Sequence, residues 1–265
     1  MSEVRFDASR AEHESLRRQS PWWGIHAARY QFAMQHVGGA RVLDIACGTG
    51  YGLTVLQTRA RQVVGADVDM GAARKARAAI GNGPEAVVVA DGCRLAFGDA
   101  TFDVITSFET LEHLELRSQF LAELRRVLTP DGLCIISTPN ANYTLPINGK
   151  PRNPHHLYEY TPEELVAELR KHFDSSVLLG QVIDSRFRIS PFWDDQQQLA
   201  RTAKVKARLL LWRVLNKLPA SLRDRLSYAL WGHPLFPGEG DYQFSEATVK
   251  TAPVLVAICQ RAASA

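Results

Sequence analysis

The sequence predicts an α/β fold in which helices cover both faces of a mainly parallel sheet. From Arg41 onward, short apolar runs alternate with stretches of helical periodicity, which is the pattern of repeated strand–helix–strand units. The chain has 265 residues, of which 46% are apolar and 22% charged, as in ordinary globular proteins. A chain of this length can bury a core without disulfides or metals to hold it together.

Seven segments carry the apolar and β-branched pattern of strands. They are residues 41–47, 62–67, 86–91, 102–108, 133–137, 177–183 and 252–259. Helices are expected over 22–37, 71–80 and 114–128, and the last should stop at the turn signal of residues 129–132. A further helix should begin after Thr161, because a Thr, a Pro and a Glu follow one another there at the spacing of a helix N-terminus.

The pattern divides the chain into four segments. We expect an N-terminal helical cap over 1–38, a core over 39–184, an inserted helical lobe over 185–246 and the last core strand within 247–265. In the core, residues 139–160 contain four prolines and several asparagines, so they form a long loop, and such loops are often functional.

Cysteine usage and the chain start predict a cytoplasmic protein. The four cysteines are far apart and form no CxxC pair, which is typical of reduced, buried thiols. The first residues lack the apolar run of a signal peptide. The aliphatic stretch of residues 209–212 in the C-terminal half is far shorter than the roughly 20 residues that a membrane span needs.

A glycine-rich turn follows the first strand directly. Asp44 is followed by Gly48, Gly50 and Gly52 in GxGxG spacing. Dinucleotide-binding turns read GxGxxG instead, and a P-loop ends in GK[ST]. Glycine allows positive φ and a close approach of backbone to ligand. The turn therefore predicts a ligand site that is neither a dinucleotide site nor a P-loop.

Acidic residues also end the next two strands. Asp67 lies 23 residues after Asp44, and Asp91 ends the third strand beside Gly92. Ligands of open α/β sheets bind beyond the carboxyl ends of the strands, where an acid can accept both ribose hydroxyls of a nucleoside. Asp91 is placed to accept from an adenine amine, directly or through the neighbouring backbone. Each acid alone is as consistent with a helix cap, but three in this order favour one bound nucleoside.

Five segments resemble the successive motifs of class I S-adenosylmethionine (SAM)-dependent methyltransferases. They are VLDIACGTGYG, VVGADVD, VVADG, FDVITSFETLEHL and ELRRVLTPDGLCIISTPN. The resemblance covers about residues 40–183, with 252–259 as the final strand. It implies a Rossmann-like fold with a seven-stranded mixed sheet, whose last strand is antiparallel to the others.

The same resemblance implies roles for the residues at the strand ends. Gly48 and Gly50 would pass beneath the methionine part of SAM, Asp67 would hold the ribose and Asp91 the adenine. The expected SAM-binding residues are Asp44, Gly48, Gly50, Asp67, Asp91 and Gly92.

An ExxEH motif follows the fourth strand. If Glu109, Glu112 and His113 open a helix, they share one face, and two carboxylates and an imidazole meet at the mouth of the SAM pocket. Such oxygen-rich clusters suit Mg²⁺ or Mn²⁺. His156 in the long loop is the expected fourth metal ligand, with His155 as the substitute.

Three roles for the motif remain open. A cation bound to vicinal oxygens would lower the pKa of a hydroxyl and orient the attacking oxygen. Alternatively His113, with Glu112, would act as a metal-free general base. The third reading is a structural one, in which Glu109 caps a helix.

Two resemblances, one of the ExxEH motif and one of two other stretches, indicate which molecule accepts the methyl group. ExxEH resembles the metal site of methyltransferases of ubiquinone synthesis and of those that methylate the 2′-hydroxyl of small RNAs. The stretches HAARYQFA and NPHHLYEYTPEEL resemble methyltransferases found among glycan and lipopolysaccharide genes. We therefore expect O-methylation of a sugar or glycan intermediate. Open alternatives are a phenolic or other small-molecule O- or N-methyltransferase and a non-catalytic partner subunit. Because no RNA-binding domain is evident, no nucleic-acid partner is expected.

The inserted lobe and the N-terminal helix add two expectations. Ten Lys or Arg and three acids lie between residues 185 and 235, so this segment carries +7 although the whole chain carries +3. Apolar residues from Leu199 to Leu218 form one helix face beside a basic stripe of Arg201, Lys204 and Arg208. The basic side of this helix is expected to be solvated or to contact an anionic acceptor or a membrane surface. In the N-terminal helix, Arg29 or Tyr30 is expected to touch SAM or the acceptor.

Overall fold

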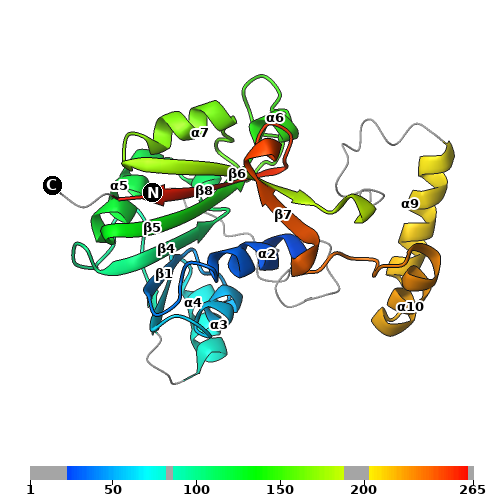
Figure 1. Cartoon of the computed structure of the whole chain (residues 1–265), viewed down its shortest axis with the longest axis horizontal. Coiled ribbons are helices and arrows are strands. Elements are labelled where there is room, and N and C mark those ends of the chain that lie inside the picture. The colour runs from blue at the N-terminus through cyan, green and yellow to red at the C-terminus, as the bar shows by residue number, and fades with distance from the viewer. Residues whose placement is uncertain (1–22, 82–85, 188–202, 262–265) are drawn as a thin grey trace. The chain divides into compact units, whose positions relative to one another are not determined.

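The structure, a computed structural model, describes residues 23–81, 86–187 and 203–261 (Figure 1). Within these residues the chain forms two compact units. The first, here called the sheet unit, comprises described residues of 29–182 and 244–261. The second, here called the helical unit, comprises those of 23–28 and 183–243.

Eight strands of the described chain form one sheet in the order β3-β2-β1-β4-β5-β8-β6-β7. They are β1 (Arg41–Ile45), β2 (Gln62–Asp67), β3 (Ala86–Val89), β4 (Phe102–Phe108), β5 (Leu128–Pro139), β6 (Ser175–Ile183), β7 (Tyr242–Ser245) and β8 (Val254–Gln260). Strands β1 to β5 pair in parallel, and β8 is antiparallel to both of its neighbours. The predicted α/β Rossmann-like fold is confirmed, whereas the predicted number of seven strands is wrong because β7 adds an eighth.

The helices follow the order expected of strand–helix–strand units (Figure 1). They are α2 (Trp23–Ala33), α3 (Tyr51–Leu56), α4 (Met70–Ile80), α5 (Arg117–Val127), α6 (Ala141–Thr144), α7 (Pro162–Leu169), α9 (Ala203–Asn216) and α10 (Ala220–Trp231). The expected N-terminus at Thr161 is confirmed, because its side chain and that of Glu164 form a reciprocal capping box.

The core of the sheet unit lies between the strands and α5. Its fully buried side chains include Leu43, Ile105, Phe120 and Leu124. Because both faces of a parallel sheet are covered, β1 and β4 read as nearly continuous apolar runs. This packing fixes the ends of β1, β2 and β4, where the candidate site lies.

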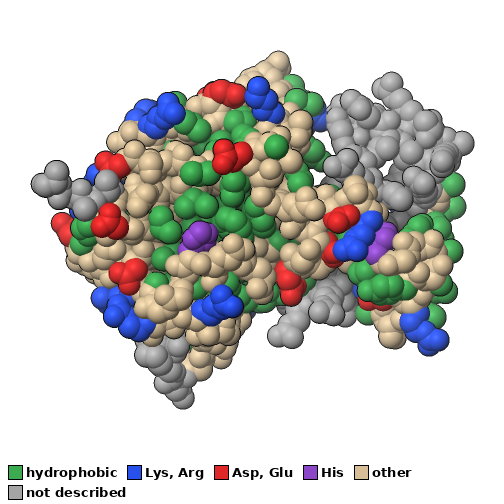
Figure 2. All heavy atoms as spheres, in the orientation of Figure 1, with side chains coloured by type: hydrophobic (Ala, Val, Ile, Leu, Met, Phe, Trp, Pro, Cys, Tyr) green, Lys and Arg blue, Asp and Glu red, His purple; other side chains and the backbone are tan. Residues whose placement is uncertain are grey.

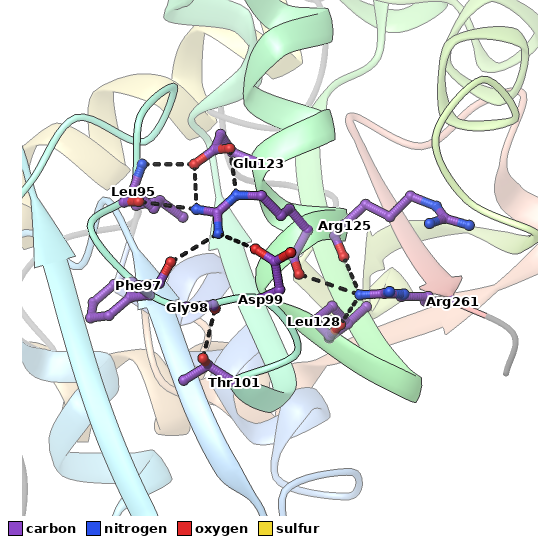
Figure 3. A network of polar contacts seen from close by, with 10 residues as sticks. Leu95, Phe97, Gly98, Asp99, Thr101, Glu123, Arg125, Leu128 and Arg261 are labelled. Carbon is purple, nitrogen blue, oxygen red and sulfur yellow. Dashed lines mark hydrogen bonds and ion pairs between the residues drawn. The ribbon is translucent and has the colours of Figure 1, made fainter. Parts of the chain in front are cut away.

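A polar network connects residues 95–99, which precede β4, to helix α5 (Figure 3). The Arg126 guanidinium donates to Glu123 and Asp99 and to the carbonyls of Leu95 and Phe97, at 2.7–3.0 Å. Arg261 donates from Nη1 to the carbonyls of residues 125, 126 and 128. Charged donors thus bond carbonyls both at the end of α5 and in the segment before β4.

The helix stop predicted at residues 129–132 is confirmed, because α5 ends just before them. The sequence signal Thr129-Pro-Asp-Gly indicated a helix stop, and α5 does end at Val127. The chain then enters β5 at once, since Leu128 already pairs with Phe102, and the register shifts before Leu133 pairs with Val104. Asp131 takes the left-handed φ of 61° in this irregularity, so the turn signal marks a bulge within the strand.

The helical unit is dominated by α9 and α10, which contact each other. In the predicted apolar face of this segment, Leu210 and Val214 are exposed, and the neighbouring Leu215 packs in a small core. Leu199 and Arg201 lie outside the described residues, as do Trp22 and most of the predicted cap. No described helix is long and apolar enough to cross a membrane. All four cysteines are buried, and none of them forms a disulfide.

Candidate active site

The site lies where the sheet order reverses direction. β1 sits between β2 and β4, so the chain leaves the ends of β1 and β4 toward opposite sides of the sheet. In open α/β sheets this switch point forms the crevice that receives ligands. The GxGxG turn follows β1 and the ExxEH motif follows β4, and the two strands are in direct register from Val42 to Ile45. The two motifs are therefore neighbours.

The GxGxG turn is held in an unusual backbone conformation. Gly48 has φ 57° and Gly50 has φ 88°, both in the left-handed region that favours glycine. A Cβ at Gly50 would lie 2.7 Å from Cα of Ala76 in α4, so the turn also packs tightly against that helix. Ala46, just after β1, is left-handed without being a glycine, at φ 58°. Such strained positions cluster at functional sites.

Asp67 fixes the turn from the end of β2. Its Oδ2 accepts from the Gly48 N–H at 2.9 Å, and its Oδ1 accepts from the Asp69 N–H at 2.9 Å. The side chain is 5% exposed. Asp67 thus orders the turn at the edge of the sheet where a ligand is expected to bind.

Asp91 and Gly92 follow β3. Asp91 is exposed, and its Oδ1 accepts from the Cys93 N–H at 2.8 Å. A Cβ at Gly92 would lie 2.7 Å from the ring of Phe120, so this position needs glycine for packing. Val68 and Met70, just beyond Asp67, are 62% and 56% exposed. Apolar side chains there are available to contact the faces of a purine.

Asp44 is fully buried at the end of β1. Its carboxyl accepts from the Thr106 hydroxyl at 2.6 Å and from the Tyr30 hydroxyl at 3.0 Å. Burial raises the pKa of Asp44 to about 7, although both hydrogen bonds act in the opposite direction. The negative charge of nearby Asp67 makes a smaller contribution to the same rise in pKa. Asp44 therefore titrates near neutral pH and organises the interior of the turn.

Gly52 explains how Tyr30 reaches Asp44. A Cβ at Gly52 would lie 2.0 Å from the Tyr30 ring, so only glycine lets this ring approach α3 so closely. The ring also meets Phe108 edge to face, with centroids 5.0 Å apart. The third glycine of the motif thus accommodates Tyr30. This contact joins α2 to the turn.

The ExxEH motif does not form the expected helical face. Glu109 has a left-handed φ of 52°, and the short 3-10 helix begins only at Leu111. The Glu109 carboxylate therefore turns away to accept from the Ser137 hydroxyl at 2.8 Å and to pair with Arg29 at 3.6 Å. Helical i, i+3 spacing from Glu109 was the wrong assumption, because the chain breaks direction at the end of β4.

Glu112 and His113 do converge. Glu112 is fully buried, and its Oε2 accepts from the Thr138 hydroxyl at 3.0 Å. Nε2 of His113 lies 3.6 Å from Oε1 of Glu112. Nδ1 of His113 lies 2.8 Å from the carbonyl of His155. Because a carbonyl only accepts, Nδ1 carries the proton, and Nε2 of neutral His113 carries the lone pair.

His156 stands beside His113 with ring centroids 4.9 Å apart. Its Nδ1 donates to Glu159 at 2.5 Å, and its Nε2 accepts from Asn153 at 2.9 Å. Burial would raise the pKa of Glu159, but the hydrogen bonds from His156 and Thr144 lower it overall. An ionised Glu159 thus fixes the tautomer and orientation of His156.

The cluster of Glu112, His113 and His156 is the part of the predicted metal site that the structure brings together. Their ligand atoms lie within 4.8 Å of one another. Glu109 is not among them, and His155 contributes its backbone carbonyl. One carboxylate and two imidazoles suit a first-row ion such as Mn²⁺ or Zn²⁺ better than Mg²⁺, which prefers oxygen. An ion bound to Nε2 of His156 would have to replace the hydrogen bond that this nitrogen accepts from the Asn153 amide.

Comparison with known proteins identifies the family. Residues 43–136 match the family model described as a methyltransferase domain. The ubiquinone biosynthesis O-methyltransferase of Azorhizobium caulinodans is 30% identical over 213 residues, which cover 69% of this chain and 84% of that protein. The chain belongs to the class I SAM-dependent methyltransferase family. The matched region contains both the GxGxG turn and the ExxEH motif.

Other members of the family extend the comparison. A probable SAM-dependent methyltransferase of Mycolicibacterium smegmatis is 35% identical over 152 residues, or 57% of this chain and 58% of that protein. The chain thus matches little more than half the length of this relative. A SAM-dependent methyltransferase structure from Archaeoglobus fulgidus has TM-score 0.58 at 18% identity, covering 96% of this chain and 100% of that one. This likeness shows the shared methyltransferase fold.

Several site residues escaped the sequence analysis. Thr106 and Thr138 lie inside strands and show no signal there, because alternation of buried positions does not reveal which hydroxyl faces a carboxylate. Gln181 accepts from the buried Arg29 at 3.1 Å from a strand distant in sequence. Glu159 could have been found, since His and Glu three residues apart often pair.

Proposed function

We propose that this member of the family is a SAM-dependent O-methyltransferase that acts on a sugar hydroxyl of a glycan or glycosylated intermediate. The observation that carries the proposal is the Glu112–His113–His156 cluster beside the turn that follows β1. A hydroxyl needs a proton acceptor to become a good nucleophile, and the cluster offers one at the end of β4.

SAM would be held by the residues at the ends of β1, β2 and β3. When bound, SAM supplies an electrophilic methyl group on a sulfonium. The left-handed turn at Gly48 and Gly50 would offer backbone to its methionine part, and Asp67, which orders that turn, would accept from the ribose. Asp91, which is exposed, would accept from the adenine. These residues fit the cofactor, because the backbone has the left-handed geometry that a close approach requires.

His113 is the proposed general base. Its Nδ1 proton is committed to the His155 carbonyl, so Nε2 is the nitrogen that accepts the proton of the acceptor hydroxyl. Buried Glu112 at 3.6 Å stabilises the imidazolium that results. SAM would supply the methyl group and retain the sulfur as a neutral thioether, while the hydroxyl proton would stay on Nε2 of His113.

A divalent ion is the second candidate for activating the hydroxyl. The spacing of Glu112, His113 and His156 supports it. The hydrogen bonds of both imidazoles through Nδ1, to a carbonyl and to a carboxylate, are those that metal-bound histidines usually make. In this case the ion would lower the hydroxyl pKa, and His113 would be a ligand instead of the base.

A phenolic acceptor is the alternative substrate. The ubiquinone biosynthesis O-methyltransferase, whose name indicates a small-molecule substrate, is the relative that matches most of this chain among those described above. Because a phenol ionises more readily than a sugar hydroxyl, the cluster would be less necessary for it. A weak effect of removing the His113 imidazole would therefore favour this acceptor.

Transfer of labelled methyl from SAM to a panel of nucleotide sugars, glycosides and catechols tests the proposal. His113→Asn should lower turnover by about a hundredfold or more, with unchanged SAM affinity. His172→Asn is the matched control, because His172 is another partly buried histidine that bonds Ser118 outside the site. If only the catechols are methylated, the acceptor is a phenol and the proposed sugar acceptor is wrong. Loss of turnover in EDTA, restored by Mn²⁺, would transfer the role of His113 to the ion.

A further inference from the structure

The α9–α10 hairpin of the helical unit exposes apolar side chains that its fold does not use. The two helices are separated by Lys217, Leu218 and Pro219 only. They are held by a small core of Leu215, Leu235 and Phe236, against which Leu218 and Trp231 pack. Most other side chains described on the hairpin face outward.

Helix α10 has an inverted distribution of polarity. Arg223 and Ser227 are buried, at 3% and 0% exposure. The Arg223 guanidinium pairs with Asp224 and stacks 4.6 Å over Phe236, and the Ser227 hydroxyl donates to the His233 carbonyl. The adjoining stripe, spaced four residues apart, is exposed by 38–56%: Leu222, Leu226 and Leu230. In ordinary surface helices the leucines face the core and the arginine faces water.

Helix α9 adds to this apolar surface. Leu210 and Val214, one turn apart, are 64% and 52% exposed, and Leu211 beside them is 39% exposed. Tyr228 of α10 is 56% exposed. Figure 2 shows hydrophobic side chains over the surface of the hairpin. Apolar residues grouped in this way usually mark a contact with a partner or a membrane.

The charge of the hairpin favours a membrane over a second copy of the protein as the partner of this apolar surface. Residues 203–232 contain seven Lys or Arg and one acid, a net charge of +6, whereas the whole chain carries +3. Two copies of such a surface would repel each other. A surface of aliphatic, tyrosine and basic residues suits the boundary of an anionic lipid layer, where the apolar groups enter the interface and the cations meet the headgroups.

We propose that the α9–α10 hairpin docks on an anionic lipid surface through Leu210 and Val214 of α9 and the Leu222–Leu226–Leu230 stripe of α10. The helices lie in the interface, since α9 has 14 residues and α10 has 12, fewer than the roughly 20 needed to span a bilayer. Docking would hold the protein at the membrane whatever the acceptor is, so this inference does not depend on the proposed activity.

Sedimentation of the full-length protein with lipid vesicles tests the proposal. Vesicles of phosphatidylcholine with a quarter of phosphatidylglycerol are compared with pure phosphatidylcholine at low and high salt. We expect binding to the anionic vesicles, weakened by salt because the cations contribute. Leu222→Gln/Leu226→Gln/Leu230→Gln should reduce the partition coefficient by more than about tenfold.

Two further variants separate the docking surface from general effects. Ile147→Gln/Val177→Gln removes two side chains that are 57% and 46% exposed in the sheet unit, and it should bind vesicles as the wild type does. Lys217→Gln/Arg225→Gln removes two exposed charges of the hairpin without touching the leucines, so it should weaken binding to anionic vesicles even if the leucine variant fails to fold. Absence of wild-type binding, or equal losses in the sheet-unit variant, would overturn the proposal. The proposal would also be overturned if the wild type is a dimer and the leucine variant is a monomer. A second copy of the protein would then cover the apolar surface.

Discussion

Replacing Asp44 by Asn should change how stability depends on pH. The carboxyl is buried, and its pKa is raised from the ordinary 3.8 to about 7. The folded protein therefore holds this proton more tightly than the unfolded chain does. Between about pH 4 and 7 the unfolded chain loses the proton first, so the contribution of Asp44 to stability is present at low pH and is lost as the pH rises.

The size of the effect follows from the shift. A shift of about three pH units corresponds to about 4 kcal/mol, at roughly 1.4 kcal/mol per unit, as an upper limit. Asn resembles the protonated carboxyl in shape and does not ionise. The stability difference between Asp44→Asn and the wild type should therefore move in favour of the variant by up to that amount between pH 4 and pH 8.

Urea unfolding followed by circular dichroism at four pH values measures this difference. Thr106→Val supplies an independent check, because it removes a hydrogen bond that lowers the pKa of Asp44. In that variant the loss of stability should continue above pH 7. If the difference in free energy of unfolding between Asp44→Asn and the wild type is the same at pH 5 and pH 8, the pKa of Asp44 is not raised by burial.

Three other substitutions probe the site and the fold. Glu159→Gln removes the ionised partner of His156 and should lower turnover while leaving SAM affinity unchanged, and equal turnover would mean that His156 needs no orientation. Gly52→Ala places a methyl group against the Tyr30 ring, so thermal unfolding should show a loss of about 1–3 kcal/mol; an unchanged midpoint would contradict the contact. Arg126→Met should cost about 1–3 kcal/mol in urea unfolding, because several partners lose a charged donor, and no loss would make the network of Figure 3 incidental.

The sheet could be predicted because its strands are buried on both faces. Mainly apolar runs such as 41–45 and 102–108 are typical of parallel strands that helices cover on both faces. Strand β7 was not predicted because its four residues, Tyr-Gln-Phe-Ser, are too few for their alternation of aromatic and polar side chains to stand out. A strand of this kind forms by pairing with a neighbour already in place.

The candidate site could be predicted in part. The acids and glycines at the ends of β1 to β3 were recognisable from their order, since parallel strands bring their carboxyl ends to one edge. The direction of Glu109 could not be predicted, because it depends on a left-handed φ that a non-glycine residue rarely adopts. The pairing of His156 with His113 joins residues 43 apart in sequence, which only the folded loop brings together.

Calorimetric titration of SAM into the wild type and Asp67→Ala tests whether Asp67 and the glycine-rich turn bind SAM. We expect the wild type to bind with a dissociation constant in the range of about 1–100 μM. Loss of the carboxylate should weaken binding by about tenfold or more. Asp103→Ala is the control, because Asp103 is a carboxylate near the opposite end of the strands, where it accepts from the Arg41 N–H, and its affinity should match the wild type. Equal affinity of all three proteins, or no binding of SAM by the wild type, would contradict the account.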